Sequence, residues 1–75
     1  MIVHWTENAL RHLTAIHDYI AQNSARYARG MVNGITHRSE HLGQFPQLGA
    51  IVAEYEDESI REVFEQPYRI IYRVA

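Results

Sequence analysis

Arginine and tyrosine side chains gather near the C-terminal end of the chain, where they could act on a phosphate group. Arg69 and Arg73 stand four residues apart in the run Tyr68-Arg69-Ile70-Ile71-Tyr72-Arg73-Val74. In a strand, this spacing puts both guanidinium groups on one face, about 13 Å apart. Metal-free cleavage of RNA needs a base, cations for the phosphorane charge and an acid for the leaving oxygen. Arg61 would add a cation, and Tyr72 or a histidine would donate the proton.

The same arginines have a simpler interpretation as members of surface ion pairs. Glu54, Glu62 and Glu65 lie close to them in the sequence. The chain has seven Lys+Arg, all of them arginine, against nine Asp+Glu, which gives a formal net charge of −2. Affinity for nucleic acid depends on dense positive charge, and ion pairs are common on protein surfaces. The charge balance therefore favours ion pairing over a basic catalytic site.

Histidine is the other residue type that could carry chemistry here. His37 and His41 are four residues apart and would share one face of a helix. A zinc site also needs a third ligand and an outer shell, and neither a nearby residue nor a cysteine supplies them. The sequence contains no phosphate-binding glycine loop and no Ser/His/Asp arrangement. We therefore predict neither a metal site nor a cofactor.

Length and composition indicate a single small globular domain spanning residues 1–75. The chain has 75 residues, 47% hydrophobic and 21% charged, with no cysteine, as in ordinary globular proteins of a reducing compartment. No apolar run is long enough to span a membrane and no signal peptide opens the chain, so a cytoplasmic protein without a membrane partner is expected. A domain this small buries only about 60% of the surface of its unfolded chain. A partner or a second copy would add to its stability.

Two amphipathic helices are predicted in the N-terminal half, after a short strand. The segment Ile2–Trp5 is β-branched and aromatic, as strands tend to be. Thr6 is a suitable N-cap for a helix over 7–22, in which apolar residues recur at helical spacing. Ser24 caps a second helix, which we expect to end at Gly43. Because the connection is so short, the two helices must form an antiparallel hairpin.

Three strands are predicted in the C-terminal half, over 50–53, 60–64 and 68–74. An acidic turn at 54–59 separates the first two, and Gln66-Pro67 connects the last two. Neighbouring strands joined by short turns pair antiparallel. The predicted fold is α+β, in the order β-α-α-β-β-β, with the helical hairpin packed on one face of a small antiparallel sheet.

Two further expectations concern packing. Gly30 and Gly34, inside the second helix, are interpreted as a site of close approach by the first helix. The large aromatic residues fall at positions typical of a core. We expect these to be mostly buried: Trp5, Tyr19, Phe45, Phe64 and Tyr72.

Three segments of the chain carry a family resemblance. They are VHWTENALRHLTAIHDYIAQNS, LGQFPQLGAIV and IREVFEQPYRIIYRV, in this order and on the corresponding predicted elements. Through them nearly the whole chain resembles the ParE/RelE toxin superfamily, also called plasmid-stabilisation proteins. The last segment is the most specific, since it is similar to a family pattern of two strands. The matching residues are Ile60, Arg61, Glu62, Tyr68, Arg69, Ile70, Ile71, Tyr72 and Val74.

The resemblance implies the toxin of a type II toxin–antitoxin system, a growth inhibitor closer to ParE-like members. Such toxins bind DNA gyrase and trap it on cleaved DNA, so they need no catalytic residue. Target binding would then fall to Arg61, Tyr68, Arg69 and Arg73. The alternative is a RelE-like mRNA endoribonuclease that works on the ribosome. Its catalytic residues would be Arg69, Arg61, Arg73 and Tyr72.

The resemblance also implies a cognate antitoxin as partner. In similar pairs, a disordered antitoxin segment folds onto the toxin, as a helix in a groove or a strand on a sheet edge. We expect the groove of the helical hairpin to receive it, near Leu13, His17, Ile20 and Tyr27. A free sheet edge would also permit a homodimer.

The chain departs from the family pattern in two places. It stops at Ala75, whereas similar toxins usually continue through one more strand, often a basic one that commonly carries the activity. This indicates a truncated chain, a degenerate toxin or a piece of a longer one, and adds a third alternative: an inactive toxin that only binds antitoxin. Before the last strand, Ile60, Arg61 and Glu62 stand in place of a lysine pair. Only Arg69 matches a basic residue of a RelE-like site.

Overall fold

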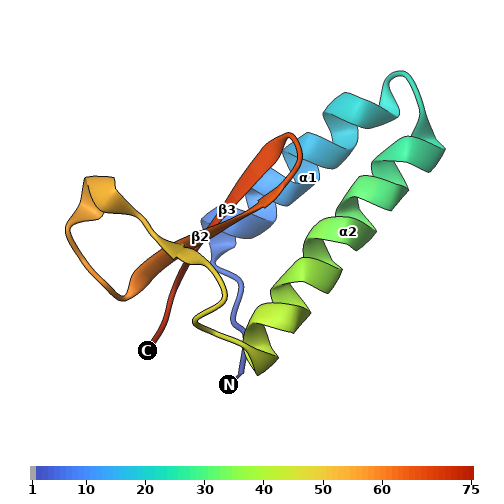
Figure 1. The fold of residues 1–75 in the computed structure, drawn as a ribbon. Helices are drawn as coiled ribbons and strands as arrows, with labels where there is room; N and C mark the ends of the chain where they lie inside the picture. The colour runs from blue at the N-terminus through green and yellow to red at the C-terminus, as the bar shows by residue number, and fades with distance from the viewer. Residues whose placement is uncertain (1) are drawn as a thin grey trace.

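Two helices followed by three strands make up the structure, a computed structural model that describes residues 2–75. The strands form one antiparallel sheet in the order β1-β2-β3. Figure 1 shows the helices side by side and antiparallel, with the sheet to one side of them. The α+β architecture predicted from the sequence is confirmed. The elements are α1 (Glu7–Ala21), α2 (Ala25–Gln44), β1 (Ala50–Ile51), the 3₁₀ helix η1 (Ala53–Tyr55), β2 (Ile60–Glu65) and β3 (Tyr68–Arg73).

Side-chain caps fix where both helices begin. The hydroxyl of Thr6 accepts a hydrogen bond from the backbone N–H of Ala9, and that of Ser24 accepts one from Tyr27 N–H, each at 3.0 Å. The end of α2 differs from the prediction, because the helix continues past Gly43 to Gln44. Phe45 leaves the helical conformation there, since a residue before proline is pushed away from it.

The buried core is small, and α2 supplies most of it. One face of α2 carries four buried residues, and β2 adds Val63. No residue of α1 is fully buried, although Leu13, Ile16 and Ile20 are half-buried. The core consists of Ala28, Ile35, Leu42, Val52 and Val63, with Ser39 as a buried polar residue whose hydroxyl donates to Thr36 O.

Most of the aromatic residues lie outside this core. Tyr19 is 70% exposed, and Phe45 and Phe64 are also exposed, so their predicted burial is wrong. Trp5 and Tyr72 are half-buried. For Phe64 of β2 the reason is the architecture: helices cover one face of the sheet, and no second layer of the described chain covers the other face, on which Phe64 lies.

The predicted N-terminal strand is absent. Residues Ile2–Trp5 form no strand, and among the described residues their backbones make no hydrogen bonds. They lie beside β3, across a cavity of about 250 Å³ lined by both segments, and Ile2 is 78% exposed. β-branched and aromatic residues favour extended backbone, but a strand also needs a hydrogen-bonded neighbour.

The remaining strands follow the prediction with shifted ends. β1 contains two residues instead of four, because Ala53 already belongs to η1. β2 runs one residue further than predicted, to Glu65, and β3 ends at Arg73 instead of Val74. Gln66 and Pro67, joined by a cis peptide bond, connect them.

The register of β2 and β3 assigns each side chain to a face. Arg61 pairs with Tyr72, Val63 with Ile70 and Glu65 with Tyr68, and directly opposed residues share a face. This is the covered face: Val63 is buried, and a Cβ on Gly34 of α2 would lie 3.0 Å from Glu65 Oε2. The opposite, open face carries Ile60, Glu62, Phe64, Arg69, Ile71 and Arg73.

The helix glycines do not contact α1 as interpreted from the sequence. The position of a Cβ on Gly34 is limited by Glu65 of β2, and a Cβ on Gly30 would meet no atom within 4 Å. Gly34 therefore accommodates the sheet, while Gly30 has no packing role.

Gly30→Ala should raise the free energy of unfolding by about 0.5–1 kcal/mol, because alanine costs less backbone entropy inside a helix. Urea denaturation would measure it. Gly34→Ala is the matched control, since its new Cβ meets Glu65 Oε2 at 3.0 Å and should gain less. A Gly30→Ala protein no more stable than the wild type would contradict this account.

Candidate functional site

The predicted functional residues divide between the two faces of the sheet. Arg69 and Arg73 lie on the open face, whereas Arg61, Tyr68 and Tyr72 lie on the covered face. The expectation that Arg61 joins the other two arginines is wrong, because its position opposite Tyr72 turns it away from them. The four residues proposed for RNA cleavage therefore do not form one cluster.

Arg61 and Tyr72 instead hold the loop that follows α2. The hydroxyl of Tyr72 accepts a hydrogen bond from Gly49 N–H at 2.9 Å and donates one to Pro46 O at 2.7 Å. Arg61 Nη1 donates to Gly49 O at 2.8 Å and to Gln47 O at 3.3 Å. These four bonds tie residues 46–49 to the sheet. The sequence carries no sign of this role, since the partners are backbone atoms far along the chain.

The loop needs glycine at one point and exposes apolar side chains at others. A Cβ on Gly49 would lie 2.6 Å from Glu62 O and 2.7 Å from the Tyr72 hydroxyl, so only glycine permits this approach. Phe45 and Leu48 in the loop and Ile51 in β1 are exposed. The hydrogen bonds from the sheet therefore hold a loop that presents apolar residues at the surface.

On the open face, Arg69 lies between two carboxylates. Its Nη2 donates to Glu54 Oε2 at 3.0 Å. Its Nε is 3.1 Å from Glu62 Oε2 in an ion pair that is not aligned for a hydrogen bond. Glu62 Oε2 is buried and has no hydrogen-bond partner among the described residues. The hydrogen bond to Glu54 raises the pKa of Arg69 above its ordinary value. Arg69 is a permanent cation, already engaged within the chain.

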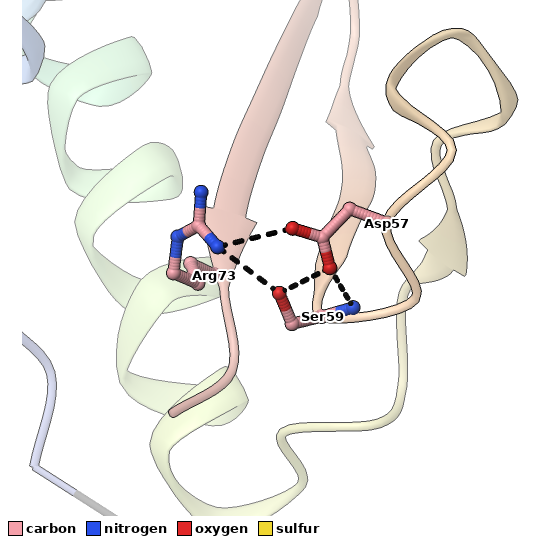
Figure 2. A network of polar contacts seen from close by, with 3 residues as sticks. All are labelled: Asp57, Ser59 and Arg73. Carbon is pink, nitrogen blue, oxygen red and sulfur yellow. Dashed lines mark hydrogen bonds and ion pairs between the residues drawn. The ribbon is translucent and has the colours of Figure 1, made fainter.

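Arg73 belongs to a second network, shown in Figure 2. Its Nη1 lies 3.2 Å from both Asp57 Oδ2 and Ser59 Oγ. Asp57 Oδ1 in turn accepts hydrogen bonds from Ser59 Oγ at 2.7 Å and Ser59 N at 2.9 Å. The bonds from Ser59 lower the pKa of Asp57, and Arg73 adds to the effect. Asp57 therefore shapes the turn before β2 and also pairs with β3.

The groups that form ion pairs on the open face carry a net negative charge. Arg69 and Arg73 contribute two positive charges against three negative ones from Glu54, Glu62 and Asp57, which leaves a net charge of −1. Ion pairs with Glu54 and Glu62 confirm the surface interpretation for Arg69. Arg73 pairs with Asp57 instead, Arg61 donates to backbone carbonyls, and Glu65 lies on the covered face. Exposed Phe64 and Ile71 occupy the same face as the arginines. This face combines ion-paired arginines with apolar surface, and β2 and β3 place no tyrosine or histidine on it.

The residues predicted to bind antitoxin lie on both helices and differ in burial. Leu13, His17 and Ile20 are half-buried on α1, whereas Tyr27 of α2 is exposed. Tyr27 borders a hollow that the other three do not line. Its lining is Ser24, Arg26, Tyr27, Gly30, Met31 and Glu65.

Residues 2–75 contain no group of three or more histidine, aspartate or glutamate side chains placed to hold a metal ion. His37 and His41 both lie on α2, where His41 is exposed and packs edge-on against the ring of Phe45. In the same part of the chain, no helix is long and apolar enough to cross a membrane.

Tyr72→Phe should lower the free energy of unfolding by about 1–3 kcal/mol, because Gly49 N–H and Pro46 O would each lose a partner. Urea denaturation is the measurement. Tyr27→Phe removes the same atom from an exposed side chain and should change stability by less than about 0.5 kcal/mol. Equal effects of the two substitutions would argue against a structural role of the Tyr72 hydroxyl.

Acid should weaken the Asp57 network. A carboxyl whose folded pKa is lowered contributes stability above its ordinary value of 3.8, and this is lost as the pH falls through the folded value. Asp57→Asn keeps an acceptor for Ser59 but removes the charge. The stability advantage of the wild type over this variant should be full near neutral pH and shrink below pH 3.8, as followed by urea denaturation across pH. An advantage independent of pH would contradict the assignment.

Known proteins give the chain its family. The sequence profile described as the ParE toxin of type II toxin–antitoxin systems, parDE, matches residues 3–75. Toxin RelE2 of Caulobacter vibrioides is 38% identical over 72 residues, which cover 95% of this chain and 77% of RelE2. No solved structure matches the chain significantly. Because the profile extends over nearly the entire chain, from residue 3 to residue 75, the protein belongs to the ParE toxin family of type II toxin–antitoxin systems.

Proposed function

We propose that this toxin inhibits growth by binding DNA gyrase and holding it on cleaved DNA, and that its cognate antitoxin prevents this binding. A toxin of a type II system implies an antitoxin partner; gyrase as the target is the proposal. The observation that carries it is the open face, where exposed Phe64 and Ile71 lie among ion-paired arginines. This surface is suited to binding a protein without reacting with it.

The chemistry of the site supports a poison over an enzyme. Metal-free RNA cleavage needs a proton donor and cations that converge on one phosphate. Arg61 and Tyr72 are turned to the covered face and hold the loop after α2. Arg69 and Arg73 are neutralised by carboxylates. Binding to gyrase requires none of these groups to transfer a proton.

The target surface we propose is Phe64, Arg69, Ile71 and Arg73. Aromatic and arginine side chains are enriched at the centres of protein interfaces, where few residues carry most of the affinity. Two of the four residues predicted from the sequence to bind the target are in this set. The other two are left out because Arg61 donates hydrogen bonds to the loop after α2 and Tyr68 lies on the covered face.

The second candidate function is cleavage of mRNA on the ribosome. It is favoured by the 38% identity to a protein named Toxin RelE2. The separation of Arg61 and Tyr72 from Arg69 and Arg73 argues against it, so it is retained as an outcome to be tested.

The test uses purified toxin, gyrase and supercoiled plasmid. Toxin should increase the linear DNA released by detergent and protease, and Phe64→Ala should reduce this at least about tenfold, as loss of a central interface residue does. Leu10→Ala, an exposed leucine on α1, is the control and should retain the wild-type effect.

Other results would separate the alternatives. New codon-spaced RNA 5′ ends in a translation extract, without gyrase-dependent DNA cleavage, would replace the gyrase proposal with ribonuclease activity. Neither effect, together with intact antitoxin binding, would identify a toxin that only binds antitoxin.

A further inference from the structure

An acidic loop lies over the arginines of the open face. This loop, residues 54–58, contains four of the nine acidic residues of the chain. Glu54 reaches Arg69 at 3.0 Å, and Asp57 reaches Arg73 at 3.2 Å. One short segment therefore engages both guanidinium groups of β3, at two points along the strand.

We propose that the acidic loop competes with nucleic acid for the two arginines of the open face. The carboxylates of Glu54 and Asp57 occupy the guanidinium groups that would otherwise bind the backbone of a single-stranded nucleic acid, and they must be displaced before the open face binds it. The proposal rests on the proposed function in one respect: the open face, which we propose binds gyrase, would also meet the cleaved DNA held in that complex.

The spacing of the two arginines on the open face fits a single-stranded nucleic acid. Arg69 and Arg73 project from one face of β3, and their Cα atoms are about 13 Å apart along the strand, so each guanidinium could reach a different phosphate of one nucleic-acid strand. Ile71 lies between them along β3, and Phe64 lies opposite Arg69 on β2. Proteins that bind single strands combine cations for the phosphates with exposed aromatic rings on which bases stack.

Among the groups that form ion pairs on this face, the carboxylates of Glu54 and Asp57 decide the sign of the net charge. With both in place the net charge is −1, which repels a polyanion. Without Glu54 and Asp57 only the single negative charge of Glu62 remains against two arginines, so the net charge becomes +1. Glu54 and Asp57 thus neutralise two arginines that would otherwise form a cationic surface, in a chain whose overall charge is −2.

The contacts are of a kind that a phosphate can replace. The side chain of Glu54 is 66% exposed, and among the described residues it accepts a hydrogen bond from Arg69 alone. The side chain of Arg73 is 65% exposed and uses only Nη1 in its ion pair. Exposed ion pairs contribute little to stability, whereas phosphate oxygens form strong, paired hydrogen bonds with guanidinium. Asp57 also accepts two bonds from Ser59, so Glu54 is the more readily displaced of the two.

The experiment compares two double variants with the same charge change in the same loop. E54Q/D57N removes both carboxylates that pair with arginine, while the amide oxygen introduced by D57N can still accept from Ser59. E56Q/E58Q removes two carboxylates that make no ion pair with the described residues. The probe is a fluorescently labelled single-stranded DNA oligonucleotide of mixed sequence, and binding is followed by anisotropy at several salt concentrations.

E54Q/D57N should bind the oligonucleotide at least about tenfold more tightly than the wild type at low salt. The logarithm of its binding constant should fall with the logarithm of salt concentration with a slope of about −1.4, as for two phosphates at about 0.7 each. E56Q/E58Q should stay within about twofold of the wild type. Adding Arg69→Ala to E54Q/D57N should abolish the gain.

Several results would overturn the proposal: no gain in E54Q/D57N, an equal gain in E56Q/E58Q, or a gain that survives Arg69→Ala. Tighter binding of the wild type to a basic peptide than to the oligonucleotide, lost in E54Q/D57N, would assign the face to a basic protein partner instead. Circular dichroism verifies folding, and the single variant E54Q replaces the double one if the latter does not fold. The assay contains no gyrase, so its failure is distinct from failure of the gyrase proposal.

Discussion

The pairing register of β2 with β3 is the constraint on which the rest of the structure depends. Glu65 lies opposite Tyr68 across a two-residue turn, and every later pair follows from it. Because side chains alternate along a strand, a slip of one residue would exchange the two faces. The observed register places Arg61 where it ties the loop after α2 to the sheet, and leaves Arg69 and Arg73 on the uncovered side.

Only one face of the sheet is covered by the helices. The described chain of residues 2–75 has no second layer to offer, and its core is confined to one face of α2 with Val52 and Val63. Apolar residues such as Phe64 and Ile71 therefore remain at the surface. For a toxin whose system includes an antitoxin, surface of this kind is available to a partner, and burying it would add to a marginal stability.

Charge on the uncovered face is governed by a segment outside the sheet. Arginines on β3 and carboxylates from the loop before β2 meet there and nearly cancel. Asp57 both forms the turn through Ser59 and pairs with Arg73, so the local structure of the loop and the electrostatics of the binding face are linked. The same ion pairs make these arginines less suited to catalysis. Under our proposal, displacing the carboxylates frees the arginines to bind nucleic acid.

The sequence alone determined what depends on neighbours along the chain. The caps at Thr6 and Ser24, the alternation in β3, the α+β class and the ParE/RelE kinship were all confirmed. Tertiary structure decided what depends on distant partners. The segment Ile2–Trp5 has the composition of a strand but forms none, since no neighbouring edge among the described residues pairs with it. Only the register between β2 and β3 shows on which face of the sheet Arg61 lies. The hydrogen bonds that set this register join residues of two different strands, so the local sequence around Arg61 does not predict it.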